Sequence, residues 1–525
     1  MPLSPNIDEQ LQRIRQKDQG KPRKRVIILG AGMAGLAAAH ELEALGHTVE
    51  ILEANPTRVG GRVHTHRFSD GTYGELGAMR IPVHHHYTRH YVAKLGLALR
   101  RFISAHQNLK CFYHIRGVRT RMEDAKTNLY PQFELSSDQA NYLIPPVMFG
   151  KALGAIVETL TDLEKLSLLA DDPATDRLRD LDRASVGEFL RLHTGADASI
   201  LLACATGLES MLDKAVTNFL RDALQDEGDR LDEIVGGMDL LPNRLRTTIT
   251  GPVRMGVRAD SITRDGNTVI VGGTSDGRRL EPWRSEYVLC ALPFSIVRHM
   301  NVAFSQEKMN AIRNLGYGSS TKVLLHCTER FWETKYGIIG GASMTDLPPR
   351  MIYYPSDVPS NGPSEVQFVD LDQGIQSTPV NQYSTLYNPR TMATISPARL
   401  MAAKEAGRPG VLLASYTWGQ DARRMGALTR SERKAVVMEG IAQIHPEIKN
   451  PGIVDDDASI FWDTYEYTHG AFSFLNPDDH ISHYRHAFSP EGSVFFAGEH
   501  CSLENAWIQG ALVSALRAVE QIVSR

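Results

Sequence analysis

Residues 26–53 have the sequence VIILGAGMAGLAAAHELEALGHTVEILE, and this stretch decides the fold. The apolar run at 26–29 predicts a buried parallel strand, and residues 34–45 have helical composition that ends at Gly46. A second apolar strand at 48–52 then leads to the acidic residue Glu53. The stretch therefore predicts a strand–helix–strand unit at the start of a parallel sheet.

The turn between the first strand and the helix has the spacing G-x-G-x-x-G, formed by Gly30, Gly32 and Gly35. Glycines let the backbone approach a pyrophosphate, and the N-terminus of a helix offers free N–H groups and positive potential. Glu53 can accept hydrogen bonds from adenosine ribose hydroxyls, which disfavours the 2′-phosphate of NADP. We predict dinucleotide binding here; the alternative is a tight strand–helix turn without a ligand.

Composition sets the broad class of the protein. A chain of 525 residues is too long for one core and predicts two or three domains. Its net charge of −4 gives no electrostatic case for nucleic acid or a membrane surface as partner. The chain has no apolar stretch long enough for a transmembrane helix, and the polar N-terminus does not resemble a secretory signal. We therefore expect a cytoplasmic protein.

The cysteines and the histidine run do not indicate a metal site. Five cysteines are scattered along the chain without C-x-x-C spacing, which fits a reducing compartment and argues against a disulfide framework or zinc. The run His84–His86 resembles a metal cluster, but adjacent residues point in different directions on any regular element. We expect no bound metal.

The remaining chain predicts an interrupted nucleotide-binding fold. Helical patterns occupy residues 86–100 and 140–230, the latter including 147–168, 185–192 and 214–226, whereas 355–409 is expected to be looped. Strands are predicted over residues 253–257, 268–271, 287–291, 321–327 and 411–417. The fold class is α/β: a doubly wound dinucleotide-binding domain (22–66, 235–315 and 486–525), a mixed α+β substrate-binding domain (1–21, 67–129 and 316–485) and a helical insertion (130–234).

Two further segments favour FAD over NAD as the dinucleotide. Gly60-Gly61-Arg62 follows the acid closely, so its glycines could approach a cofactor and Arg62 could neutralise a pyrophosphate. Ala497-Gly498-Glu499 precedes a C-terminal helix and suits a second contact on a long ligand. Because only one complete dinucleotide fingerprint is present, electrons are expected to come from the substrate and to leave to oxygen or another external acceptor.

These segments together resemble the flavin-containing amine oxidase superfamily. Within it, Gly74-Glu75-Leu76-Gly77-Ala78-Met79-Arg80 is similar to the L-amino-acid oxidase branch. The resemblance extends from about residue 25 to the end of the chain. Further stretches carry it, namely 318–322 (GSSTK), 331–333 (FWE), 345–348 (TDLP), 352–355 (IYYP) and 496–499 (FAGE).

The resemblance implies roles at the substrate end of the site. Arg80 and Tyr416 would hold a substrate carboxylate, and Lys322 would hold a water near flavin N5. The carbonyl of Ala506 would accept a hydrogen bond from the substrate amino group, and Trp507 and Phe472 would form two aromatic walls before the flavin. The alternatives are a structural salt bridge for Arg80, a strand tyrosine for Tyr416, a lysine reaching solvent for Lys322 and ordinary core packing for the two aromatic residues.

The cofactor end follows from the motifs and the resemblance. The residues expected to bind the cofactor are Gly30, Gly32, Met33, Ala34, Gly35, Glu53, Gly60, Gly61, Arg62, Ala78, Met79, Arg80, Val253, Gly498, Glu499, Trp507 and Ile508. Val253 resembles a residue whose backbone contacts the adenine, and Glu499 would face the ribityl or ribose hydroxyls. Ala471 stands where monoamine oxidases carry the cysteine that tethers their flavin, so the FAD is expected to be non-covalent.

The activity implied is oxidative deamination of L-amino acids with molecular oxygen, giving 2-oxo acids, ammonia and hydrogen peroxide. The aromatic residues expected around the site favour bulky apolar or aromatic substrates, and a broad range stays open. Three alternatives remain: an amine or polyamine oxidase, a decarboxylating amino-acid monooxygenase, and a non-catalytic flavin-binding regulatory protein. The resemblance to this family also implies a homodimer or a larger homo-oligomer.

Overall fold

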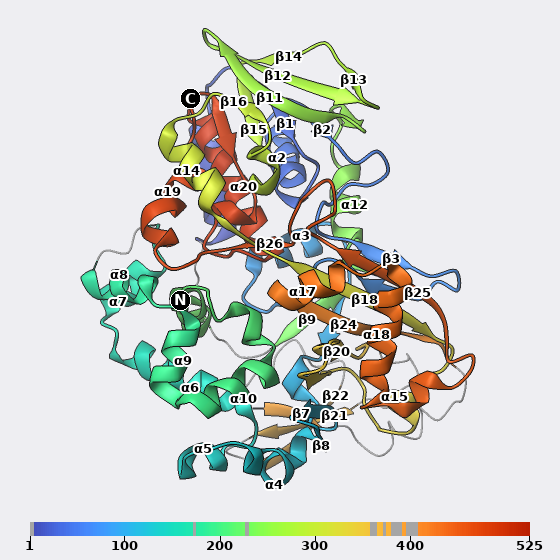
Figure 1. Ribbon diagram of the computed structural model, residues 1–525. Coiled ribbons are helices and arrows are strands. Elements are labelled where there is room, and N and C mark those ends of the chain that lie inside the picture. Colours follow the sequence, from blue (N-terminus) through green and yellow to red (C-terminus); the bar gives the residue numbers. More distant parts are fainter. Residues whose placement is uncertain are drawn as a thin grey trace.

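The computed structural model describes residues 5–171, 175–225, 230–357, 365–370, 374–379, 391–394 and 408–525. A five-stranded parallel sheet forms the centre of the upper part of Figure 1. Its strands in spatial order are β10 (Val253–Met255), β2 (Thr48–Glu53), β1 (Arg25–Leu29), β15 (Tyr287–Cys290) and β27 (Val494–Phe496). The predicted α/β class with an interrupted parallel sheet is therefore confirmed, because strands from three distant segments pair in it.

Strand β1 is buried on both faces. Val26 and Ile28 pack in one core with the helices α2 (Met33–Ala44) and α20 (Ile508–Val523). Ile27 and Leu29 belong to a second core on the opposite face. A continuous apolar run is the pattern expected of such a strand, since neither face meets water.

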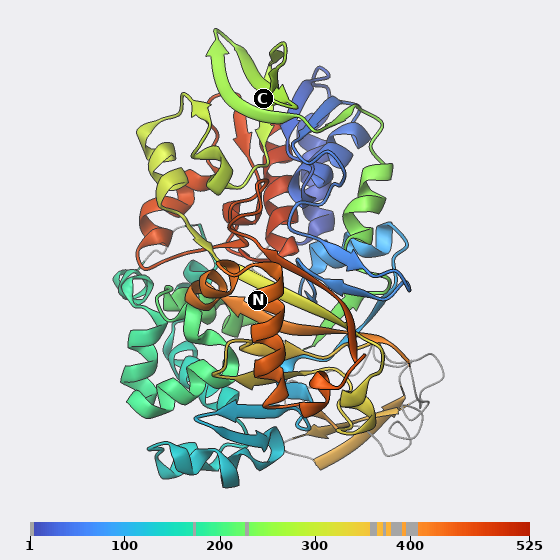
Figure 2. The ribbon, with the colours of Figure 1, turned by 45° about the vertical axis from the view of Figure 1, so that its right-hand side comes forward.

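A second sheet covers that opposite face and lies above the parallel sheet in Figure 2. It is antiparallel except for its last strand, and its elements are β11 (Arg258–Asp265), β12 (Thr268–Ser275), β13 (Arg278–Arg279), β14 (Trp283–Ser285) and β16 (Asn301–Val302). Val269 and Val271 of β12 belong to the same core as Ile27 and Leu29 of β1. On the helical side, α1 (Ile7–Asp18) packs along α20, and Lys17 Nζ lies 2.7 Å from Glu520 Oε1.

The lower part of the molecule contains a seven-stranded mixed sheet. In spatial order its strands are β25 (Val454–Phe461), β18 (Ser320–Cys327), β24 (Gly410–Trp418), β20 (Met351–Tyr353), β19 (Ala342–Thr345), β7 (Phe112–Ile115) and β8 (Val118–Arg121). The helices α17 (Gly419–Gly426) and α18 (Arg430–Ala442) pack against β18 and β24. This sheet supplies the strand residues of the substrate end.

Helices gather beside this sheet, at the lower left of Figure 1. They are α6 (Pro145–Thr159), α7 (Asp162–Leu168), α8 (Asp176–Arg183), α9 (Val186–Thr194), α10 (Ala196–Thr206) and α11 (Val216–Gln225). Further helices are α3 (His86–Lys94), α4 (Ala125–Asn128), α5 (Ser137–Asn141), α12 (Leu240–Thr247), α13 (Phe294–Val297), α14 (Gln306–Asn314), α15 (Phe331–Thr334) and α19 (Arg485–Phe488). None of the helices in the described part of the chain has both the length and the apolar character needed to cross a bilayer.

Three small sheets, which the sequence analysis did not predict, accompany the larger sheets. Their strands are β3 (Thr65–Arg67) with β4 (Tyr73–Glu75), β5 (Ile81–Pro82) and β6 (Leu99–Phe102) on either side of β9 (Leu231–Ile234), and β17 (Gly316–Gly318) with β26 (Phe472–Phe474). The helix expected over 86–100 ends at Lys94, because the chain turns at Gly96, with φ +67°, into β6. Tertiary pairing with β9 overrides the local pattern there.

Two other expectations need correction. The helix expected over 147–168 is two helices, because Thr161 caps α7 in a reciprocal capping box with Glu164 and ends α6 before it. The loop expected over 355–409 contains a three-stranded antiparallel sheet, formed by β21 (Glu365–Asp370), β22 (Gly374–Pro379) and β23 (Thr391–Thr394). The other parts of that stretch lie largely outside the described residues, as does residue 226 of the helix expected over 214–226.

Candidate functional site

One elongated cavity connects the carboxyl edge of the parallel sheet to the seven-stranded sheet. Ligands of open α/β sheets bind at this edge, where the strands end and the connecting loops begin. The cavity brings together most residues predicted for the site, namely Gly30, Gly32, Met33, Ala34, Glu53, Gly60, Gly61, Arg62, Ala78, Lys322, Tyr416, Phe472, Gly498, Glu499, Ala506, Trp507 and Ile508.

The three glycines of the first turn have different structural roles. Gly30 has φ +95°, so a side chain would strain the backbone there. A Cβ atom at Gly35 would lie 2.0 Å from the carbonyl oxygen of Gly30, so this glycine allows the helix to pack on its own turn. A Cβ at Gly32 would meet no protein atom within 4 Å. Gly32 therefore lines open space, the form of cradle that a pyrophosphate requires.

The second glycine pair packs directly on this turn. The amide of Gly60 donates a 2.8 Å hydrogen bond to the carbonyl of Ala31, and Gly60 forms a bridge with Gly32. Both Gly60 and Gly61 have positive φ, at +99° and +57°. The two glycine segments thus build one wall of the cavity.

Glu53 stands at the end of β2 and organises the adjacent loop. Its Oε2 accepts a 2.6 Å hydrogen bond from the amide of Ala31, and its Oε1 accepts a 2.7 Å bond from the amide of Asn55. Burial raises the pKa of this carboxyl above its ordinary value, although the two amide donors counteract the shift. The acid therefore lines the cavity with its position fixed by the backbone.

Arg62 and Glu499 form an ion pair inside the cavity wall. Arg62 Nη1 lies 2.6 Å from Glu499 Oε1, and the buried carboxylate also accepts hydrogen bonds from Ser473 and from the amide of Ala506. Burial alone would raise the pKa of Glu499, but Arg62 and the other donors hold it below its ordinary value. The carboxylate expected to face the cofactor hydroxyls is thus engaged mainly with the protein.

Lys322 lies on β18 with its ammonium turned toward the cavity wall. Nζ donates to the carbonyl oxygens of Gly77, at 2.7 Å, and Glu75, at 3.1 Å. Burial lowers the pKa of Lys322 from its ordinary 10.5 to about 7. The alternative of a lysine reaching bulk solvent does not fit this side chain, which is 1% exposed.

Tyr416 is placed beside Lys322 by strand register. The two residues are direct partners in the antiparallel pair of β18 and β24, and Lys322 Nζ lies 4.5 Å from the centre of the tyrosine ring. Burial raises the pKa of Tyr416 to about 12, so its hydroxyl stays protonated near neutral pH. The ring of Tyr416 packs against that of Trp418, with 5.0 Å between the ring centroids. Trp418 in turn packs against Phe472, with 6.2 Å between the centroids.

Arg80 lies between Tyr353 and Trp507. Its Nη1 donates a 3.3 Å hydrogen bond to the hydroxyl of Tyr353, and its guanidinium carbon lies 5.7 Å from the centre of the indole of Trp507. The ring centroids of Tyr353 and Tyr416 are in turn 6.3 Å apart. The structure therefore groups Arg80 with Tyr416 and Trp507, although Arg80 itself is not among the residues that line the cavity.

Three other predicted residues lie outside the cavity lining as well. Gly35 serves helix packing, and Met79 lines a neighbouring cavity with Tyr353. Val253 belongs to β10, paired with Ile51, whereas Val257 lines the cavity. An adenine contact at position 253 stays a prediction, and Val257 is a second candidate for it.

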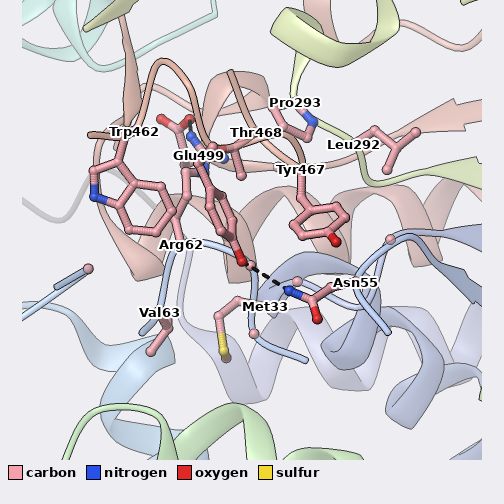
Figure 3. Close-up of a pocket in the computed structure, with 18 of the residues that line it drawn as sticks. Met33, Asn55, Arg62, Val63, Leu292, Pro293, Trp462, Tyr467, Thr468 and Glu499 are labelled. Atoms are coloured by element: carbon pink, nitrogen blue, oxygen red, sulfur yellow. Dashed lines mark hydrogen bonds and ion pairs between the residues drawn. The ribbon is translucent and has the colours of Figure 1, made fainter. Parts of the chain in front are cut away.

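The sequence analysis missed one complete wall of the cavity. Trp462, Tyr465, Glu466, Tyr467 and Thr468 line it from a single segment that follows β25. Trp462, Tyr467 and Thr468 lie on the opposite side of the site from Met33 in Figure 3, where a dashed line also marks a hydrogen bond of Asn55. The dense aromatic run in WDTYEYT was the signal that could have identified this wall.

Comparison with known proteins agrees with the motifs. The family model described as flavin containing amine oxidoreductase matches residues 33–523. The chain is 34% identical to the flavin-dependent L-tryptophan oxidase RebO of Lentzea aerocolonigenes, over 95% of this chain and 98% of the relative. It is 31% identical to an L-amino-acid oxidase of Siganus canaliculatus, over 95% of this chain and 85% of that protein.

Solved structures show the same fold. A putrescine oxidase with bound putrescine superimposes with a TM-score of 0.68 at 17% identity, covering 96% of this chain and all of that one. A cyclohexylamine oxidase from Brevibacterium oxydans IH-35A gives a TM-score of 0.67 at 18% identity, covering 96% of this chain and 99% of that one. The resemblance inferred from the motifs is confirmed, and the chain belongs to the family of flavin-containing amine oxidoreductases.

Proposed function

We propose that this protein is an FAD-dependent L-amino-acid oxidase. The observation that carries the proposal is the single cavity, which joins the glycine turn and Glu53 at one end to Lys322 and Tyr416 at the other. Arg80 stands beside the second end and supplies a guanidinium for a substrate carboxylate. Relatives named L-amino-acid oxidase, with similarity over nearly the whole chain, support the same activity.

The residues at the first end fit FAD. Gly32 leaves open space for phosphates, Gly60 and Gly61 bring a second backbone segment close, and Glu53 would hold the adenosine ribose. Ala471 lines the cavity and has no thiol, which supports non-covalent binding. When bound, the flavin would supply the redox chemistry, namely oxidation of the substrate carbon–nitrogen bond with oxygen as the final electron acceptor.

The residues at the second end would position the amino acid. The Arg80 guanidinium and the protonated Tyr416 hydroxyl donate to the carboxylate, and the carbonyl of Ala506 accepts from the amino group. Ala506 has φ +65°, unusual for a residue with a side chain, and its amide is held at 2.8 Å by Glu499. Trp507 and Phe472 would exclude water from the two sides of the substrate.

Lys322 would hold a water molecule and exchange protons near the reacting atoms. Its lowered pKa means that the amine loses a proton readily near neutral pH, in contrast to an exposed lysine. The overall reaction balances as L-amino acid, O₂ and H₂O giving 2-oxo acid, NH₃ and H₂O₂. In this proposal the protein contributes orientation and electrostatics, and the cofactor contributes the redox step.

We further propose that the substrates are bulky apolar or aromatic L-amino acids. Tyr416 and Phe472 line the cavity at the substrate end, Trp418 packs against both of their rings, and the lining rings provide an apolar surface there. The Lentzea aerocolonigenes relative is named for L-tryptophan, an aromatic amino acid. We also expect a homodimer or a larger homo-oligomer, which light scattering after gel filtration measures directly.

A peroxide-release screen tests the activity. The purified holoenzyme is supplied with the twenty L-amino acids, their D-enantiomers and simple amines. Turnover of L-amino acids to 2-oxo acids supports the proposal. Turnover of amines alone identifies an amine oxidase, an amide product identifies a monooxygenase, and a flavin that no substrate bleaches under anaerobic conditions identifies a non-catalytic protein.

A further inference from the structure

The cavity wall that follows β25 is one continuous segment, residues 462–468, which we call the strap. Five of its seven residues line the cavity: Trp462, Tyr465, Glu466, Tyr467 and Thr468. The labelled members of the strap face Met33 and Asn55 across the site in Figure 3. A ligand that lies along the glycine turn is therefore covered by the strap on its other side.

One partly buried cluster of contacts anchors the strap to the dinucleotide-binding loop. The hydroxyl of Tyr465 accepts a 2.7 Å hydrogen bond from Arg58 Nη2 and a 2.9 Å hydrogen bond from Asn55 Nδ2. The guanidinium carbon of Arg58 also lies 5.5 Å from the centre of the Tyr465 ring. The bond from Arg58 is charge-assisted, so it belongs to the stronger class of protein hydrogen bonds.

This anchor is rigid because its partners are themselves fixed. Asn55 donates its amide to Glu53 at 2.7 Å, and its side-chain oxygen accepts from the amides of Thr57 and Arg58. The acid at the end of β2, which is expected to hold the ribose, is thus connected through Asn55 to Tyr465. The connection spans 410 residues of sequence between Asn55 and Tyr465.

A second anchor of the strap lies at the surface. Glu466 forms an ion pair with Arg258 at 2.8 Å, and the two side chains are 60% and 44% exposed. Exposed ion pairs are screened by water and salt and contribute little. The ends of the strap are held by Trp462 Nε1, which donates to the carbonyl of Leu76 at 3.0 Å, and by Ser295, which donates to the carbonyl of Thr468.

We infer that the strap locks FAD in the cavity, and that Tyr465 is the positioning residue that keeps it closed. The inference rests on the proposed function, because it concerns the same cofactor. FAD lying between the glycine turn and the strap can leave only when the strap moves away from Asn55 and Arg58. The rate of FAD release therefore depends on the Tyr465 anchor far more than on the Glu466 ion pair.

The test compares Tyr465→Phe in the holoenzyme with the matched control Tyr336→Phe, which removes a hydroxyl that donates to the Glu447 carboxylate at 3.0 Å and lies outside the cavity lining. FAD release is followed by the rise in flavin fluorescence after strong dilution, and global unfolding is followed by circular dichroism. Loss of a hydrogen bond to a charged group predicts release about 10-fold faster in Tyr465→Phe. We expect FAD release from Tyr336→Phe to stay within about 3-fold of the wild type, and the unfolding midpoint of the apoprotein to fall by a similar amount in both variants, because each loses a hydrogen bond to a charged group.

Three results would overturn the inference. Release at the wild-type rate in Tyr465→Phe removes the strap as the lock and leaves the proposed function intact, whereas wild-type protein that never binds FAD removes both. If a variant folds poorly, a measurement on the wild type alone still tests the inference. Amide hydrogen exchange in residues 462–468 is expected to slow when FAD binds to the apoprotein, and unchanged exchange contradicts the strap.

Discussion

Lys322 Nζ lies 2.7 Å from the carbonyl oxygen of Gly77, and this contact joins the seven-stranded sheet to the glycine segment that precedes Arg80. A Cβ atom at Gly77 would lie 2.1 Å from the carbonyl oxygen of Arg62, so that segment is also packed tightly on the cofactor side. The substrate end and the cofactor end of the cavity therefore meet at Gly77. Substitution of Lys322 is therefore expected to affect both the substrate end and the cofactor end of the cavity.

Replacement of Lys322 by Met removes the titratable amine and keeps most of the side-chain volume. We expect reoxidation of the reduced flavin by oxygen to slow on the order of 100-fold, the range typical of a lost proton-transfer group. The wild-type rate should also change with pH near 7, because burial lowers the pKa of Lys322, and raises the pKa of the neighbouring Glu75 carboxyl, to about that value. Lys322→Met should remove the part of this dependence that comes from the amine. Stopped-flow absorbance of the flavin measures both, and an unchanged profile would contradict the role.

Replacement of Arg80 by Gln separates an amino-acid oxidase from an amine oxidase. Loss of a charge-assisted carboxylate contact is worth about 1.5–3 kcal/mol, so KM for an L-amino acid should rise roughly 10- to 100-fold. An aromatic amine without a carboxylate is the control, and its slow turnover should not change. Equal losses for both substrates would show that Arg80 acts only through the packing of Trp507.

Two glycine substitutions in one turn distinguish cofactor binding from folding. Gly32→Ala places a methyl group in open space with ordinary backbone angles, so the apoprotein should keep its stability while FAD affinity falls about 10-fold or more. Gly35→Ala places the methyl group 2.0 Å from the carbonyl of Gly30 and should lower the free energy of unfolding by about 1–3 kcal/mol. Flavin titration and thermal unfolding of both variants provide the comparison.

The Arg62–Glu499 pair predicts part of the acid sensitivity of the protein. The pKa of Glu499 is lower in the folded protein than its ordinary 4.5, so its ionised form stabilises the fold above that pH and the contribution disappears as pH falls through the lowered value. Glu499→Gln should lose this contribution at neutral pH, leave Arg62 without its charge partner and reduce the dependence of stability on acid. Urea unfolding at neutral and acidic pH measures both effects, and an equal loss at the two pH values would contradict the assignment.

Local sequence patterns predicted the parts of the site that are contiguous in the chain. The glycine turn, the helix after it and the strand that ends at Glu53 all occur where the patterns placed them. The strands that carry Lys322 and Tyr416 were also predicted, because short continuous apolar runs, here Val-Leu-Leu in each strand, mark buried strands. The missed elements, such as β6 and β9, are short strands that form only by pairing with a distant segment.

The sequence by itself determined the family, the dinucleotide turn and the identity of the side chains that can bind FAD and an amino acid, because these depend on residue type and on spacing over a few residues. Only the tertiary structure decided which of them meet. Arg62 and Glu499 are 437 residues apart in sequence, and Lys322 and Gly77 are 245 apart. Such contacts arise from the packing of whole sheets and helices, so no local pattern contains them, and the strap with its Tyr465 anchor belongs to the same class.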